Sequence, residues 1–390
     1  MTSSDNITWT GTYTPSTDVE DTSNILTLAT TYTDSAGNTG PSATTSNFEI
    51  DTKYPTVSSF TLSDTSLKAG ETATVTLVFS EAVSGFSSSD DITVVNGSLS
   101  TMTSSDNITW SGTYTPSTDV EDTSNVLTLA TTYIDSAGNA GPSATTSNFE
   151  IDTKYPTVSS FTLSDSALKV GETATVTLVF SEAVSGFSSS DDITVVNGSL
   201  TTMTSSDNIT WTGTYTPSTD VEDTSNVLTL ATTYTDSAGN AGPSVTTSNF
   251  EIDTKYPTVS SFTISDNALK AGETATVTLV FSEVVSGFSS SDDITVVNGS
   301  LSTMTSSDNL TWTGTFTPTI DIEDTSNVLT LATSYTDNAG NAGPSATTSN
   351  FEIDTKYPTV SSFTLSDTSL KAGETATVTL VFSEVVSGFS

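Results

Sequence analysis

Apolar and polar residues alternate with a period of two along much of the chain. The clearest run is 71–80, where Ala73, Val75, Leu77 and Phe79 alternate mainly with threonines. Such alternation predicts a strand with one buried face. Similar runs rich in Val, Ile, Thr, Phe and Tyr are separated by short polar turns, and no stretch has a helical period. The pattern therefore predicts an all-β protein.

Seven strands are predicted in one unit of this pattern. They cover 57–62, 71–80, 92–95, 98–103, a segment that holds Ile108, Trp110 and Tyr114, then 126–133 and 145–151. This number and spacing are typical of an immunoglobulin-like β-sandwich. Asn96-Gly97 is a strong hairpin signal and predicts a turn between the third and fourth strands. Trp110 is predicted to pack in the core rather than to form a ligand platform.

The segment Asp-Thr-Lys-Tyr-Pro occurs four times, with its proline at positions 55, 156, 257 and 358, a period of 101 residues. Proline cannot donate to a sheet and holds the preceding tyrosine extended, so each segment predicts a stiff joint between domains. We expect tandem seven-stranded immunoglobulin-like β-sandwich domains in a linear array. The expected units are a partial repeat at 1–54, full repeats at 55–155, 156–256 and 257–357, and a partial repeat at 358–390. The two end pieces are expected to be only partly folded, as in a window cut from a longer array.

The charge of the chain limits the classes of partner that it can bind. It has 46 acidic residues against 8 basic ones, and neither histidine nor cysteine. This balance argues against nucleic acid and against direct contact with an anionic membrane, and it favours cations. Disulfides and thiolate metal sites are excluded, and no apolar run is long enough to span a bilayer. We expect a monomer whose main protein partners are the neighbouring domains of the same chain.

Acidic residues are predicted to gather where two domains meet. If successive strands alternate in direction, the loops with Glu81, Asp91 and Asp135 lie at the pole where Asp51 arrives, facing the preceding domain's loop with Asp18. Such a set repels itself when bare, and oxygen ligands without His or Cys select Ca²⁺. The alternative is that these acids are solvated turn residues that only keep the protein soluble. The predicted Ca²⁺ ligands are Asp18, Asp51, Glu81, Asp91, Asp135, Asp119, Asp152, Glu182, Asp192, Asp236, Asp220, Asp253, Glu283, Asp293 and Asp337.

Several motifs resemble one protein family. They are Leu67-Lys68-Ala69-Gly70-Glu71-Thr72, Phe79-Ser80-Glu81-Ala82-Val83-Ser84-Gly85-Phe86, Asp91-Ile92-Thr93-Val94, Asn96-Gly97 and Asp135-Ser136-Ala137-Gly138-Asn139. In this order they resemble the bacterial Ig-like repeats of giant repeats-in-toxin adhesins. The resemblance implies tandem extender domains that Ca²⁺ makes rigid and that hold a terminal binding domain away from the cell. It implies a secreted location on the bacterial cell surface, with the adhesive target bound by other domains.

Two other functions and one other stabiliser are weighed against the extender. An enzyme would have to rely on carboxylate, Lys, Ser or Tyr chemistry, and three near-identical copies show no sign of an active site. A multivalent ligand-binding module, for example one for carbohydrate, remains an alternative, although near-identical loops suit a spacer better. An isopeptide bond from Lys68 to an asparagine would stabilise a spacer without metal, but this lysine is predicted to lie in an exposed turn.

Overall fold

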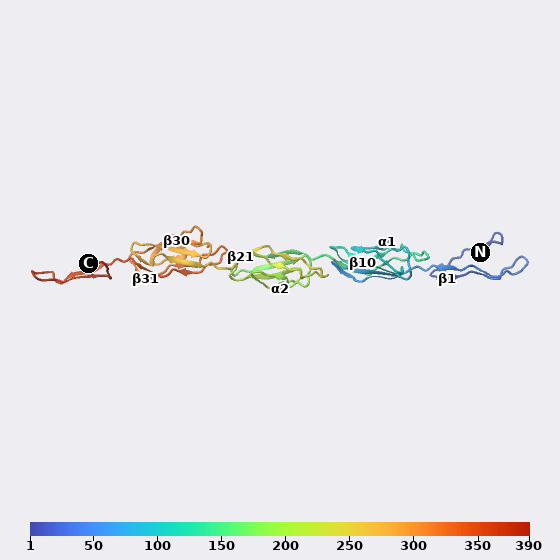
Figure 1. Ribbon diagram of the computed structural model, residues 1–390, viewed down its shortest axis with the longest axis horizontal. Coiled ribbons are helices and arrows are strands. Elements are labelled where there is room, and N and C mark those ends of the chain that lie inside the picture. The colour runs from blue at the N-terminus through green and yellow to red at the C-terminus, as the bar shows by residue number, and fades with distance from the viewer.

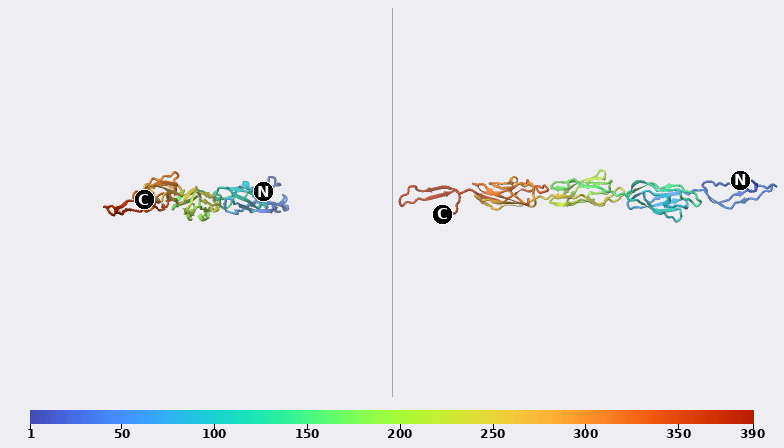
Figure 2. Two further views of the ribbon diagram at one scale, coloured as in Figure 1. Left: turned by 60° about the vertical axis from the view of Figure 1, so that its left-hand side comes forward. Right: turned by 90° about the horizontal axis from the view of Figure 1, so that it is seen from above.

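The computed structural model describes residues 1–390 and forms an elongated array (Figure 1). Three β-sandwiches follow one another in line, and a thinner piece extends from each end. The view from above shows the same five parts in sequence order (Figure 2). The fold is therefore a linear array of tandem immunoglobulin-like sandwiches, almost all β, as the sequence predicts.

One layer of the first sandwich is a four-stranded sheet in the order β5-β7-β10-β9. Its strands are β5 (Val57–Leu62), β7 (Ala73–Phe79), β10 (Thr109–Pro116) and β9 (Gly97–Leu99). In β7 every second side chain is fully buried, which is the pattern expected of a central strand with one face on the core. The alternation read from the sequence therefore places this strand correctly.

The second layer consists of two short three-stranded sheets. One has the order β11-β14-β6, from β11 (Glu121–Asn125), β14 (Phe149–Asp152) and β6 (Ser66–Lys68), and its β14–β6 pairing is parallel. The other has the order β13-β12-β8, from β13 (Ala144–Thr145), β12 (Thr128–Leu129) and β8 (Ile92–Thr93). A one-turn helix, α1 (Ser88–Asp91), precedes β8. Because β14 is the last strand of the sandwich, its end leads directly into the joint.

The other two sandwiches repeat this arrangement. The second is built from β15 (Val158–Leu163), β16 (Ala167–Lys169), β17 (Ala174–Phe180), α2 (Ser189–Asp192), β18 (Ile193–Thr194), β19 (Gly198–Leu200), β20 (Thr210–Pro217), β21 (Glu222–Asn226), β22 (Thr229–Leu230), β23 (Val245–Thr246) and β24 (Phe250–Asp253). The third is built from β25 (Val259–Ile264), β26 (Ala268–Lys270), β27 (Ala275–Phe281), α3 (Ser290–Asp293), β28 (Ile294–Thr295), β29 (Gly299–Leu301), β30 (Thr311–Pro318), β31 (Glu323–Asn327), β32 (Thr330–Leu331), β33 (Ala346–Thr347) and β34 (Phe351–Asp354).

Each sandwich has its own hydrophobic core of 15 buried residues, and no core shares a residue with another. In the first core the ring of Tyr133 packs 4.7 Å from that of Phe79, centroid to centroid, and both side chains are fully buried. Trp110 packs against this core from its edge, half-buried beside Phe86. Because the cores are separate, the stability of one sandwich does not depend on the interior of the next.

The predicted hairpin at Asn96-Gly97 is wrong. The strand before it, β8, lies in one layer, whereas β9 after it lies in the other. Asn96 has a left-handed φ of 51°, and its side-chain amide donates to Asp122 and Asn125 in the second layer. The signal for a tight turn is real, because asparagine tolerates positive φ. The turn carries the chain from one sheet to the other instead of reversing it within one.

Two further elements differ from the sequence prediction. The segment 116–125, which falls between two predicted strands and is expected to be a loop, contains β11, which pairs with β14. The segment 126–133, predicted as one long strand, has only β12 in a sheet. A register shift between Asp122 and Asn125 marks an irregularity within β11, and the next strand, β12, pairs in the other three-stranded sheet.

The end pieces hold fewer strands than a full repeat. Residues 1–54 form β1 (Glu20–Asn24) paired with β4 (Phe48–Asp51), and β2 (Thr27–Leu28) paired with β3 (Ala43–Thr44). Residues 358–390 form β35 (Val360–Leu365) paired with β36 (Val378–Phe382). Apolar side chains that a full repeat buries are exposed here, as Phe363 is at 71 %. The pieces are thus partly formed, with no closed core.

Candidate metal centre at the joints

Three carboxylates from different parts of the chain meet at each joint. At the joint between the first and second sandwiches they belong to Asp152, the last residue of β14, Glu182, which follows β17, and Asp236, in the loop 231–244. One oxygen of each lies within 4.8 Å of the others. We call such a set a joint triad. The three joint triads are Asp51, Glu81 and Asp135; Asp152, Glu182 and Asp236; and Asp253, Glu283 and Asp337.

The loop around Asp236 holds its carboxylate in place. One oxygen accepts the backbone N–H groups of Gly239 and Asn240 at 2.8 and 2.9 Å, and the other accepts the Asn240 side-chain amide at 2.9 Å. Gly239 has a φ of +93°, which is a conformation that favours glycine. At the first joint, burial raises the pKa of Asp135, but hydrogen bonds from Asn139, Ala137 and Gly138 outweigh it, so the pKa is lowered. The loop at the first joint therefore favours the ionised form of Asp135.

The joint itself is fixed to the preceding sandwich. The β14 register places Asp152 opposite Glu121 on one side and Lys68 on the other. The hydroxyl of the buried Thr153 donates to the Ser117 carbonyl at 2.7 Å and accepts the Val120 N–H at 3.0 Å. Asp152 is therefore presented to the next sandwich by a stiff extension of a strand. The part of the joint outside any strand is limited to residues 153–157.

The joint triad carries negative charge that the charge of Lys154 offsets only in part. Burial raises the pKa of Glu182, and the charges of Asp236, Asp152 and Glu121 raise it further. Burial and the charge of Asp236 likewise raise the pKa of Asp152. The Lys154 ammonium lies 3.1 Å from the carboxylate of Glu121, an acid outside the triad. The arrangement therefore destabilises the ionised carboxylates unless a cation joins them.

The residues present fit a calcium ion. Calcium–oxygen distances are about 2.3–2.6 Å, so two oxygens on opposite sides of one ion lie about 5 Å apart. The oxygens of a joint triad are within this span of one another. The set contains carboxylates alone, without the nitrogen or sulfur ligands that zinc prefers. What such a centre can do is bind a hard divalent cation between two domains.

Asp91 and its equivalents Asp192 and Asp293 do not join the triads. The Asp192 side chain is 3 % exposed and points into its own sandwich. It accepts the Ser188 N–H at 2.7 Å, which ties down the start of α2, and it also binds the Thr233 hydroxyl. Its lone pairs are thus used within the fold. The one-turn helix that the sequence did not reveal is the reason, because it turns this carboxylate away from the joint.

Asp192→Ala is expected to destabilise the second sandwich by about 3 kcal/mol, because it leaves a buried N–H and a hydroxyl without their charged acceptor. The exposed neighbour Asp191 provides the matched control, and Asp191→Ala is expected to stay within about 0.5 kcal/mol of the parent. Calorimetric unfolding measures both. If the Asp192→Ala protein is as stable as the parent but binds one cation fewer, Asp192 is a ligand of the metal centre.

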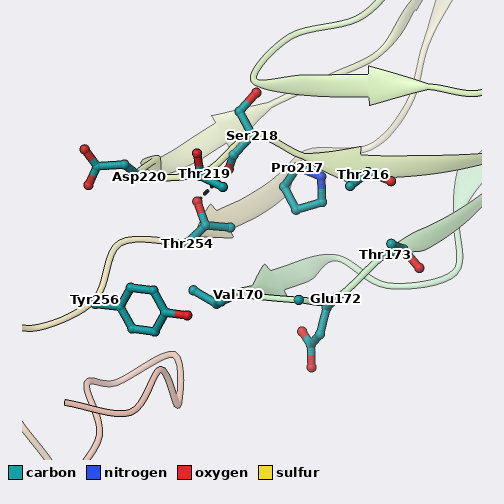
Figure 3. Close-up of a pocket in the computed structure, with 11 residues that line it drawn as sticks. Val170, Glu172, Thr173, Thr216, Pro217, Ser218, Thr219, Asp220, Thr254 and Tyr256 are labelled. Atoms are coloured by element: carbon teal, nitrogen blue, oxygen red, sulfur yellow. Dashed lines mark hydrogen bonds between the residues drawn. The ribbon is translucent and has the colours of Figure 1, made fainter. Parts of the chain in front are cut away.

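Asp18, Asp119 and Asp220 also lie outside the triads. Asp220 has a left-handed φ of 62° at the turn between β20 and β21, and Figure 3 shows its side chain directed away from Tyr256. The same residue lines a hollow of about 370 Å³ together with Thr254 and Tyr256 (Figure 3). The acids at this pole are therefore spread around a turn and not gathered at one point.

This hollow is the feature that a small ligand would use. Six of its eleven lining residues carry a hydroxyl group, and two are hydrophobic. The first sandwich has a smaller counterpart of about 230 Å³ that includes Tyr155. In the third sandwich Ile320, which is 81 % exposed, replaces the threonine found at this turn in the other two. The hollows thus differ between repeats, whereas the joint triads are the same three residue types at every joint.

Solved structures that resemble this chain include several bacterial adhesion proteins. The Escherichia coli adhesin FdeC is 14 % identical, with a TM-score of 0.28, over 76 % of this chain and 96 % of its own. Yersinia pseudotuberculosis InvD is 14 % identical, with a TM-score of 0.28, over 75 % of this chain and 96 % of its own. The bacterial integrin-binding protein invasin is 17 % identical, with a TM-score of 0.26, over 82 % of this chain and 65 % of its own. No curated protein matches the chain in sequence.

One sequence family accounts for nearly the whole chain. The profile of the bacterial Ig-like domain matches it four times, at residues 1–50, 51–151, 152–252 and 253–353. No helix in the protein has both the length and the apolar character needed to cross a membrane. Taken with the tandem sandwiches, these matches show that the chain belongs to the bacterial Ig-like domain family.

Proposed function

We propose that this segment is a calcium-stiffened extender of a bacterial cell-surface adhesin of the repeats-in-toxin type, which projects a distal binding domain away from the cell. The observation that carries the proposal is the joint triad, which recurs at all three joints that lead into a full sandwich. Each triad takes one carboxylate from the joint and two from the following sandwich. A cation bound there would connect two domains, which is the property a spacer needs.

The protein residues supply position and charge. Asp152 is held by the end of β14, whereas Glu182 and Asp236 are held by the next sandwich. Bare, they repel one another, and this repulsion adds to burial in raising the pKa values of Asp152 and Glu182. Bound Ca²⁺ would supply the neutralising charge and share these oxygens. With the repulsion removed, the two sandwiches keep one orientation and the array behaves as a rod.

The resemblance to giant adhesins supports the location and the partners. We place the segment outside the cell, on the bacterial surface, as a monomer whose contacts are with its own neighbouring domains. Attachment to the target is assigned to a different domain of such an adhesin. A multivalent carbohydrate binder would use the hollows beside the joints, and their variation between repeats favours the extender.

Titration calorimetry with Ca²⁺ tests the centre directly. The 390-residue chain is expected to bind three ions, one at each joint triad. Glu182→Gln removes one charged ligand and is expected to reduce the number of tight sites to two. Glu251→Gln removes an exposed acid that lies outside the triads and should leave three. Absence of binding, or three unchanged sites in the Glu182→Gln protein, would refute the assignment.

A further inference from the structure

Asn240 forms hydrogen bonds with both sandwiches that flank its joint. It belongs to the second sandwich, in the loop that carries Asp236. Its side-chain amide nitrogen donates to the carbonyls of Asp152 and Lys154 in the joint, at 2.9 and 3.3 Å. Its side-chain oxygen accepts the backbone N–H of Ala69, in the first sandwich, at 2.8 Å. One side chain thus connects the next domain, the joint and the preceding domain.

The orientation of this amide follows from its surroundings. The nitrogen faces only oxygens, namely two carbonyls and a carboxylate of Asp236, and the oxygen faces an N–H group. The side chain is 3 % exposed, so loss of these partners would leave buried polar groups without water. Lys68, beside Ala69, also lies next to this loop, since its ammonium is 3.1 Å from the position that a Cβ on Gly239 would take.

The chain contains its own comparison. Asn341 repeats the arrangement at the next joint, where it accepts the Val170 N–H at 2.9 Å and is again 3 % exposed. Asn139 binds its own loop and the joint carbonyls, at 3.3 and 3.4 Å, but no preceding turn faces it and it is only half-buried. The contact with the preceding sandwich is therefore what completes the burial of this asparagine.

We propose that Asn240 and Asn341 are positioning residues that dock neighbouring sandwiches directly, through protein hydrogen bonds that do not require an ion. The extender role of this docking rests on the proposed function, whereas the docking itself rests on these contacts. Two contributions then hold each joint: the asparagine contact, and a cation in the joint triad. Without the cation the docked orientation competes with carboxylate repulsion. Without the asparagine contact the cation has to hold the joint alone.

Ala69→Pro removes one side of this contact without touching the triad. Lys68 to Glu71 form a turn in which the Glu71 N–H donates to the Lys68 carbonyl at 3.1 Å, with Gly70 at φ +82°. These are the features of a type II turn, in which the second position, here Ala69, favours proline. The substitution therefore deletes the N–H that binds Asn240 and leaves the turn intact. Unfolding of the first sandwich should occur at the same temperature or a higher one.

Distances between spin labels report the docking. The chain has no cysteine, so Thr113→Cys with Thr214→Cys places two labels on equivalent exposed sites across the joint between the first and second sandwiches, which we call the first full joint. Thr214→Cys with Thr315→Cys does the same across the second. Pulsed electron paramagnetic resonance in EDTA and in Ca²⁺ then gives the distance distribution at each joint. The parent chain in EDTA is expected to show a docked distance together with a broader, undocked component.

Ala69→Pro is expected to lower the ratio of docked to undocked molecules about fivefold in EDTA, the equilibrium value of one net hydrogen bond. The change should appear at the first full joint only, since the second uses Val170. Ala271→Pro, in the same turn of the third sandwich but faced by no asparagine, is the control and should change neither joint. An unchanged distribution for Ala69→Pro in EDTA would overturn the proposal.

A second variant tests whether the change seen with Ala69→Pro comes from the lost hydrogen bond or from the proline itself. Asn240→Ala is expected to loosen the first full joint, whereas Asn139→Ala, which loses the same loop and joint bonds, should leave it unchanged. The measurements in Ca²⁺ distinguish the docking proposal from the proposal of a cation centre. If Ca²⁺ changes no distance but Ala69→Pro still broadens the EDTA distribution, the cation centre fails and the docking stands. If both chains are equally broad in EDTA and narrow in Ca²⁺, the docking fails and the cation centre stands.

Discussion

Removal of Ca²⁺ with EDTA is expected to shorten the average length of the 390-residue chain in solution and to lower its melting temperature. In Ca²⁺ the small-angle X-ray scattering profile should be that of a straight rod, as in Figure 1. In EDTA the carboxylates of each joint triad repel, so the joints bend and the radius of gyration falls. The asparagine contacts keep part of the population docked, so the chain should bend without becoming a random coil.

The thermal effect follows from mass action. A ligand bound only by the folded protein at one hundred times its dissociation constant stabilises it by about 2.7 kcal/mol. For a domain of this size that corresponds to a rise in melting temperature of about 10 °C or more. Because two carboxylates of each triad come from the following sandwich, each of the three sandwiches should gain this stability.

Matched variants distinguish the joint triads from general screening of a chain with a net charge of −38. Replacing Glu81, Glu182 and Glu283 together by Gln should abolish the response to Ca²⁺. Replacing Glu150, Glu251 and Glu352 by Gln removes the same number of charges from exposed positions and should preserve it. Identical scattering profiles and melting temperatures in Ca²⁺ and EDTA would contradict the calcium-stiffened extender.

Gly242→Ala is expected to destabilise the second sandwich by about 3 kcal/mol, at the upper end of the usual cost of overpacking a core. A Cβ at this position would lie 2.0 Å from the ring of Tyr234. That ring cannot move aside, because it is fully buried, packs 4.8 Å from Phe180 and donates its hydroxyl to the Pro243 carbonyl at 2.9 Å. Gly242 therefore provides the space that a tyrosine needs at this position.

Scanning calorimetry of the whole chain measures this effect, with the other sandwiches as internal references. Their cores are separate, so only one of the transitions should move to lower temperature. Gly171→Ala is the control, because its Cβ would meet nothing within 4 Å, and only its φ of +80° costs energy, about 1 kcal/mol. Equal shifts for the two variants would show that the clash is relieved by rearrangement.

The sheet-forming segments were predictable where local pattern and tertiary environment agree. The alternation in 71–80 matches β7, because a central strand with one buried face imposes a period of two on its own side chains. The hairpin at Asn96-Gly97 was not predictable in the same way. Its dihedral angle is local, but whether the following strand pairs within the same sheet depends on partners such as Asp122 and Asn125, far along the chain.

The candidate site was likewise predictable from the sequence only in part. Asp51, Glu81 and Asp135 meet because strand direction brings two loops and the joint to one pole. Asp91 is at the same pole in sequence terms, but a one-turn helix rotates its carboxylate into the sandwich. Asp18 lies on a turn with positive φ and is not among the three carboxylates that meet there. Strand order can place a loop at a pole, but the direction of a side chain depends on the loop's own conformation.

The sequence by itself determined the all-β composition, the 101-residue period and the oxygen-only chemistry of any metal site, because these depend on residue types and their spacing. Only the tertiary structure decided which acids converge and which are used within the fold. It alone gave Asn240 a partner 171 residues away. Contacts between domains form where residues far apart in the sequence pack together, so the local sequence pattern does not predict them.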